Sequence, residues 1–187
     1  MKKSFSLPEL LIAITITILI SEAAYFASNV GRQTFNRTSE KVEITQNARV
    51  LLDRMSREIR QATEVVTDLP PVNNDPANPP SSEIIFEDGH TAINRYITYR
   101  LENNQVRRII TAYFFSEGLP DSSEWVLKNA RGENNRLPNY LDISNEIIAD
   151  KIISLQIWGE SLINIDITAG INDQQEQFST TVFARNL

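Results

Sequence analysis

The chain has 187 residues, of which 41% are hydrophobic and 22% are charged, and its formal net charge is −6. This acidic balance argues against nonspecific nucleic-acid binding, which depends on Lys and Arg contacts to phosphates, so no nucleic acid is expected among the partners. The sequence has no cysteine, which excludes disulfides and thiolate metal sites. Its length allows about one globular domain after an apolar N-terminal segment.

The N-terminal segment contains an uncharged run from Leu10 to Ser21. As a helix, residues 5–26 would be about 33 Å long, enough to cross a hydrocarbon core of about 30 Å. A backbone in lipid must satisfy its own hydrogen bonds, so the Ile/Thr alternation within this run is expected to be helical. The sequence therefore predicts a membrane-spanning helix over residues 5–28.

Glu9 is a carboxylate at the edge of this apolar run, with no basic side chain beside it. An ionised carboxylate costs about 2–3 kcal/mol at the centre of a membrane helix and less toward its edge. Such a charge is tolerated when it has a partner. Cleavage after Ser4 would provide one, because it would create an α-amine on Phe5, close to Glu9 in the sequence.

The stretch KKSFSLPELL, residues 2–11, resembles the class III leader of type IV pilins and pseudopilins. The resemblance implies that residues 1–4 are a leader and that a prepilin peptidase cuts between Ser4 and Phe5. It also implies methylation of the new amine of Phe5. The basic residues of this leader are Lys2 and Lys3, which also favour a cytoplasmic start of the chain.

In the same family the acidic residue at the position of Glu9 pairs with the N-terminus of a neighbouring subunit during filament assembly. The chain departs from the family pattern at Ser4, where Gly is usual, and at Pro8, which replaces an aliphatic residue. Phe26 stands where the family has a helix-kinking proline. Residues 46–62 resemble, more loosely, the corresponding helix of J- and W-type minor pilins.

Two alternatives for the N-terminus remain open. A secretory signal peptide would have a basic start, an apolar stretch and small residues at its cleavage site. Residues 21–23 offer such a site, and the mature chain would then begin at Ala24. An uncleaved membrane anchor is the other alternative. In either case the protein would be a cell-surface binding domain that does not polymerise. A third alternative, an uncleaved membrane-anchored hydrolase, would need a pocket that gathers His90 with an acid and a nucleophile.

Residues 29–66 are predicted to continue the first helix in amphipathic form. Apolar residues recur there at spacings of three and four, as expected for one helix face. This face is expected to pack against a sheet of the same protein. Its members are Ala48, Leu52, Met55, Ile59, Ala62 and Val66.

Residues 67–82 contain five prolines and are predicted to form an extended connection. Residues 83–187 are predicted to form an antiparallel β-sheet domain. A first strand is expected over 82–87, followed by a hairpin that turns at Asn103-Asn104. Strict register would place Arg100 opposite Arg107, so a longer turn or a twisted sheet is expected there.

Residues 115–145 are polar and rich in turn formers, and are predicted to be a loop with one short strand at 124–127. Alternation of apolar and polar residues then predicts a three-stranded antiparallel meander over 153–157, 163–167 and 178–184. The predicted fold class is therefore α+β. A long N-terminal helix, membrane-spanning in its first half and amphipathic in its second, packs on a C-terminal antiparallel sheet domain.

Catalytic motifs are scarce. The single histidine, His90, lies beside a glycine in a predicted turn, and no Gly-rich phosphate loop or His-based metal spacing occurs. Asp142, Glu146 and Asp150 lack the spacing of a calcium loop and are predicted to lie on a solvated face. We therefore expect no enzymatic activity, no catalytic or metal-ligating residue and no cofactor.

These observations predict a structural subunit, a minor pilin or pseudopilin, of a type IV pilus-like or type II secretion filament. The resemblance implies four kinds of partner: a prepilin peptidase, other pilin or pseudopilin subunits, an assembly platform membrane protein, and membrane lipid. The expected location is the cytoplasmic (inner) membrane, as a single-pass protein with its C-terminal domain outside the cytoplasm, and then an extracytoplasmic filament.

Overall fold

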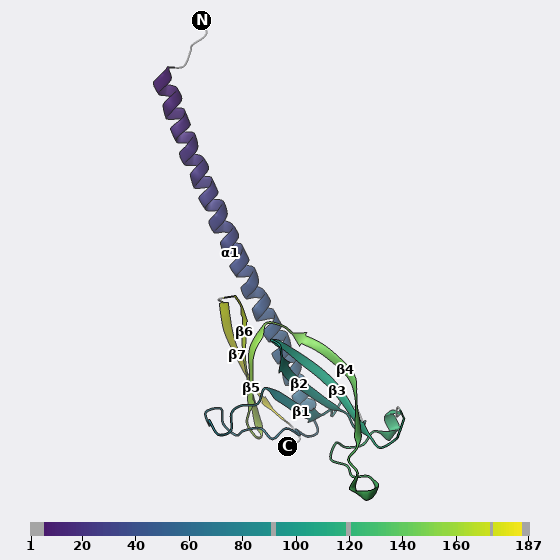
Figure 1. Ribbon diagram of the computed structural model, residues 1–187. Coiled ribbons are helices and arrows are strands. Elements are labelled where there is room, and N and C mark those ends of the chain that lie inside the picture. Colours follow the sequence, from purple (N-terminus) through teal and green to yellow (C-terminus); the bar gives the residue numbers. More distant parts are fainter. Residues whose placement is uncertain (1–5, 91–92, 119–120, 173, 185–187) are drawn as a thin grey trace. The chain divides into compact units, whose positions relative to one another are not determined.

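The computed structural model describes residues 6–90, 93–118, 121–172 and 174–184 (Figure 1). It has one long helix, α1 (Leu7–Gln61), and two antiparallel sheets, which confirms the predicted α+β class. The chain divides into two compact units, Met1–Val42 and Glu43–Leu187. The described part of the first unit is the N-terminal portion of α1 with Ser6 before it. The second unit contains the rest of α1 and both sheets.

The seven strands form a four-stranded sheet in the order β1-β2-β3-β4 and a three-stranded sheet in the order β5-β6-β7. All pairs are antiparallel between neighbours in the sequence, so each sheet is a simple meander. The strands are β1 (Glu83–Glu87), β2 (Tyr96–Glu102), β3 (Gln105–Phe114), β4 (Asn139–Ala149), β5 (Ile152–Trp158), β6 (Leu162–Ile171) and β7 (Gln174–Phe183).

The core of the second unit forms where one face of α1 packs against both sheets. The fully buried helix residues are spaced by three or four positions, which places them on one face. They are Ile44, Ala48, Leu51, Met55 and Ile59. This confirms the predicted stripe at Ala48, Met55 and Ile59, whereas Leu51 is fully buried and the predicted Leu52 only partly buried. The last two predicted members, Ala62 and Val66, lie beyond the end of the helix. The facing core residues include Phe86, Tyr99, Ile157 and Ile165.

The helix ends at Gln61, five residues before the predicted end at residue 66. The following segment pairs its backbone with β1 instead of continuing the helix. The amide of Val66 donates to the carbonyl of Ile85 at 2.8 Å, and the amide of Glu87 donates to the carbonyl of Glu64 at 2.8 Å. Val66 therefore belongs to a strand-like segment along the outer edge of β1, where its backbone groups find partners that a helix end would lack.

The hairpin between β2 and β3 turns at Asn103 and Asn104, as predicted. Both residues have positive φ, 50° and 61°, which asparagine tolerates and a two-residue hairpin turn requires. Arg100 does lie opposite Arg107, so the expectation of a longer turn is wrong. Glu102 makes this register possible, because its carboxylate lies 3.0 Å from Arg100 and 3.5 Å from Arg107.

The predicted loop over 115–145 is wrong at its C-terminal end, because β4 begins at Asn139 and runs for 11 residues. Register shifts on β4 interrupt its pairing with β3 at two places, so its side chains do not alternate regularly. The predicted strand at 124–127 is reduced to a single bridge between Val126 and Tyr113. Short 3₁₀ turns lie before and after it, at Ser122–Glu124 and Glu133–Asn135.

The three-stranded meander at the C-terminal end is confirmed. Ile163, Ile165 and Ile167 on the central strand β6 are buried, and the residues between them face outward. The turn after β5 contains Gly159, with φ of +116°. A Cβ atom at this position would lie 2.0 Å from the carbonyl oxygen of Leu162, so the turn requires glycine.

Candidate functional site

The first unit presents a helix whose apolar side chains are exposed. Leu10, Leu11, Ile12, Leu19 and Ile20 are each more than half exposed. A helix of a water-soluble domain normally buries an apolar stripe of this size against other elements. By length and composition, α1 contains a segment that could cross a membrane. The described part of the predicted segment 5–28 is therefore helical and apolar enough to cross a membrane.

Hydroxyl groups within this segment bond to the helix itself. Thr15 donates to the carbonyl of Leu11 and Thr17 to the carbonyl of Ala13, each at 2.8 Å. Ser21 bonds in the same way to the carbonyl of Thr17. A hydroxyl satisfied in this way carries no free donor into an apolar environment, which explains how a run alternating Ile and Thr can lie on an apolar helix.

Glu9, the predicted assembly residue, lies in the first turn of α1. Its Oε2 accepts hydrogen bonds from the amide and the hydroxyl of Ser6, both at 2.9 Å. The carbonyl of Ser6 accepts from the amide of Leu10, so Ser6 is the N-cap of the helix. Ser6-x-x-Glu9 is thus half of a capping box, a signal present in the sequence that our interpretation of Glu9 did not use. The other predicted processing residues, Lys2, Lys3, Ser4 and Phe5, lie outside the described residues.

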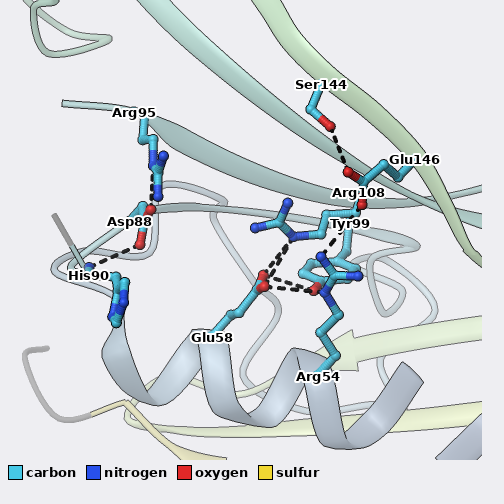
Figure 2. A network of polar contacts seen from close by, with 9 residues as sticks. All are labelled: Arg54, Glu58, Asp88, His90, Arg95, Tyr99, Arg108, Ser144 and Glu146. Atoms are coloured by element: carbon cyan, nitrogen blue, oxygen red, sulfur yellow. Dashed lines mark hydrogen bonds and ion pairs between the residues drawn. The ribbon is translucent and has the colours of Figure 1, made fainter. Parts of the chain in front are cut away.

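A second polar feature lies inside the second unit, where α1 packs against the four-stranded sheet. Glu58 on α1 accepts a hydrogen bond of 2.8 Å from the Tyr99 hydroxyl on β2. Both of its oxygens accept from Nε of Arg108 on β3, at 3.0 and 3.1 Å. Arg54, one turn earlier on α1, lies 3.4 Å away (Figure 2). Glu58 therefore joins the helix to two neighbouring strands.

Burial controls the ionisation of this cluster. Burial, and then the charge of Glu58, raise the pKa of Tyr99 far above its ordinary value, so its hydroxyl keeps the proton that it donates. Burial also acts to lower the pKa of Arg108, but the hydrogen bond and charge of Glu58 outweigh it and the pKa lies above the ordinary value. The Arg108 guanidinium therefore keeps its positive charge beside Glu58.

The predicted turn histidine lies beside this cluster. Asp88 is 7% exposed and accepts from Nε of Arg95 and from the backbone amide of His90, the latter at 3.0 Å. His90 is exposed. Its backbone amide is the donor to Asp88, and among the described residues no hydrogen bond reaches its imidazole ring.

Of the three carboxylates predicted on a solvated face, Asp142 and Glu146 are exposed and Asp150 is half-buried, and each also has a protein partner. Asp142 accepts from the Thr111 hydroxyl at 2.8 Å, and Asp150 accepts from the side-chain amide of Asn47 at 2.6 Å. Glu146 lies 3.5 Å from Arg54. Within the described ranges, no group of three or more His, Cys, Asp or Glu residues is arranged to hold a metal ion.

Comparison with known proteins finds no matching family model, no similar curated protein and no similar solved structure. The architecture itself is compatible with a pilin-like fold. It has a long N-terminal helix that begins apolar, and the later part of that helix packs on antiparallel sheets.

Proposed function

We propose that this chain is a structural subunit of a type IV pilus-like or type II secretion filament, either a minor pilin or a pseudopilin. The observation that carries the proposal is the exposed apolar portion of α1 with one carboxylate, Glu9, in its first turn. In filament assembly, such helices leave the membrane and pack against one another. The leader of residues 1–4 is removed by a prepilin peptidase, and the sheet domain lies outside the cytoplasm.

In this mechanism the negative charge of Glu9 pairs with a positive charge on a neighbouring subunit. Ser6 satisfies one oxygen of the carboxylate but supplies no positive charge. In a bundle of apolar helices an unpaired charge is costly, whereas an ammonium partner restores neutrality. The free amine of Phe5 on a neighbouring subunit is such a partner. Pairing would then fix the register of one helix against the next.

Mass spectrometry of the mature protein tests the processing step. We expect an N-terminus at a methylated Phe5. A chain starting at Ala24 would instead indicate a secretory signal peptide and a surface-binding domain that does not polymerise. A filament subunit that still starts at Met1 would contradict the proposal. The unbroken helix from Leu7 to Gln61 favours cleavage before the helix over cleavage within it.

The variant Glu9→Gln distinguishes a role of Glu9 in filament assembly from its role in capping the helix. In Glu9→Gln the side chain keeps an acceptor for the Ser6 amide, because glutamine also serves in a capping box, but it loses the charge. We expect this variant to reach the membrane at the normal level and to enter filaments poorly. Ser6→Ala, which removes the hydroxyl contact and keeps the charge, should assemble close to normally.

Glu22→Gln is the matched control, because it removes a carboxylate from the same helix away from its first turn. It should assemble like the parent chain. Normal assembly of Glu9→Gln together with failure of Ser6→Ala would mean that Glu9 acts through capping alone, and the charge-pairing mechanism would be rejected.

A further inference from the structure

A pocket of about 330 Å³ lies beside the Glu58 cluster, between α1, β3 and the segment that precedes β2. Its size falls at the lower end of small-molecule sites. Four arginines line it: Arg54, Arg57, Arg95 and Arg108. The carboxylates in its lining are Glu58 and Asp88. The lining is therefore cationic in a chain whose overall formal charge is −6.

Both carboxylates are already neutralised by arginines of the same pocket. Glu58 pairs with Arg108, and Asp88 pairs with Arg95. Each of these two arginines uses its Nε atom for the pairing. A guanidinium has five N–H donors, so the terminal amines of both residues retain donor capacity. Arg54 and Arg57 bring two further positive charges to the lining. Arg54 lies 3.4 Å from Glu58 and 3.5 Å from Glu146, and Arg57 lies 3.2 Å from Asp53, which is outside the lining.

Arg108 is the most informative of the four. Its side chain is only 10% exposed, and its Nε atom donates to both oxygens of Glu58. A further side-chain hydrogen bond joins its guanidinium to Tyr99. Among the described residues, the buried side-chain atoms without a hydrogen-bond partner belong to Arg100, Ser116 and Trp125. No nitrogen of Arg108 is among them. Figure 2 shows the guanidinium extending from β3 toward the side where Asp88 and Arg95 lie. Arg108 lines the pocket, and its five N–H groups include donors beyond those that Glu58 and Tyr99 accept.

We propose that this pocket binds a small oxyanion, a phosphate or carboxylate group, through the terminal amines of Arg95 and Arg108, with Arg57 at its helix side. Planar guanidinium groups donate two parallel hydrogen bonds to such anions, and a positive lining raises their local concentration. The proposal is independent of filament assembly, because every residue that lines the pocket belongs to the second unit.

The test is isothermal titration of the full-length chain in a non-ionic detergent, with inorganic phosphate and with citrate, at constant ionic strength set by sodium chloride. We expect saturable binding of at least one of them, with Kd in the millimolar range or tighter. Glycerol phosphate forms a third arm, because it represents the headgroup of an anionic phospholipid. Binding of glycerol phosphate without citrate would assign the site to phosphate groups, and binding of citrate alone would assign it to carboxylates.

Arg57→Gln is the informative variant. Its side chain is 64% exposed, so the substitution should leave the fold intact, unlike a change at Arg108. We expect about tenfold weaker binding, the loss typical of one charge-assisted contact. Arg49→Gln is the matched control: it lies about 12 Å away along the helix, beyond the screening length of about 8 Å at physiological ionic strength, and does not line this pocket.

Binding that Arg57→Gln weakens and Arg49→Gln leaves within twofold would establish the site. Equal weakening by both variants would mean that the anion responds to the general field of the helix, and would overturn the proposal. Absence of saturable binding for all three anions would overturn it as well. Neither result would bear on the cleavage or assembly of the N-terminal helix.

Discussion

Glu58 on α1 and Arg108 on β3 form an ion pair in which one Nε atom donates to both carboxylate oxygens, at 3.0 and 3.1 Å. Their side chains are 17% and 10% exposed. Water therefore solvates neither group well, and each depends on the other. The Tyr99 hydroxyl donates to the same carboxylate and completes its coordination. Such a pair contributes little when intact, but loss of one partner is costly because the other is left buried and charged.

Glu58→Ala should lower the free energy of unfolding by about 3 kcal/mol, the low end of the range for breaking a buried pair, because Glu58 keeps some exposure. Chemical denaturation followed by the fluorescence of Trp125 and Trp158 measures this loss, since both lie in the second unit. The control is Glu146→Ala, whose carboxylate is 52% exposed and lies 3.5 Å from Arg54. It should cost less than about 1 kcal/mol. Equal losses would show that burial of the pair is unimportant.

Stability should fall above about pH 10, where tyrosines of the unfolded chain lose their protons. In the folded protein Tyr99 keeps its proton in this range, because burial raises its pKa. The unfolded state therefore binds fewer protons than the folded state and becomes favoured as pH rises. Tyr99→Phe should reduce the slope of unfolding free energy against pH. The comparison is Tyr140→Phe, a substitution at a residue that is 69% exposed. Identical slopes in the parent chain and in Tyr99→Phe would refute this account.

Glu102 should hold the β2–β3 hairpin in register, because it lies near two arginines that face each other across the strands. All three side chains are partly exposed, so Glu102→Gln should cost less than about 1 kcal/mol, with a greater loss at low salt. Adding Arg107→Gln should restore most of that stability, because it removes the like-charge contact. The measurement is a double-mutant cycle at two salt concentrations; additive effects of the two substitutions would contradict the mechanism.

Gly159→Ala should lower the free energy of unfolding by about 1–3 kcal/mol, because residue 159 has positive φ and a Cβ would meet the carbonyl of Leu162. Gly118→Ala provides the comparison, since a Cβ there meets nothing within 4 Å. It should be neutral or slightly stabilising. Urea titration of both variants measures the difference, and a tolerated Gly159→Ala would show that the turn can adopt another conformation.

Helix and strand periodicity predicted the elements that have one clearly buried face. Met55 and Ile59 recur at helical spacing, and the isoleucines of β6 alternate, so their patterns match the structure. β4 was missed because it is an edge strand with most of both faces exposed, and because register shifts break its alternation. The end of α1 was misplaced because Val66 continues the helical spacing, although its backbone pairs with β1.

The two candidate sites also differ in how far the sequence alone predicts them. Glu9 is a candidate from sequence alone because it is a carboxylate at the edge of an apolar run, with no basic side chain beside it. The pocket arginines were not, because Arg57, Arg95 and Arg108 are distant in the sequence. The pairing of β2 with β3 and the packing of α1 on that sheet bring them to one place. The carboxylate of Glu58 is also typical of a solvated helix face when it is considered without the sheet that covers it. Long-range pairing therefore limits what local patterns predict.

The attachment of Glu58 to two adjacent strands also has a mechanical consequence. A force applied along the axis of the buried part of α1 would act across the hydrogen bonds to Tyr99 and Arg108 and the apolar contacts beside them all at once, in shear. Contacts loaded together resist separation more strongly than contacts that peel apart in succession. The anchorage of the helix in its sheets is thus suited to transmitting tension.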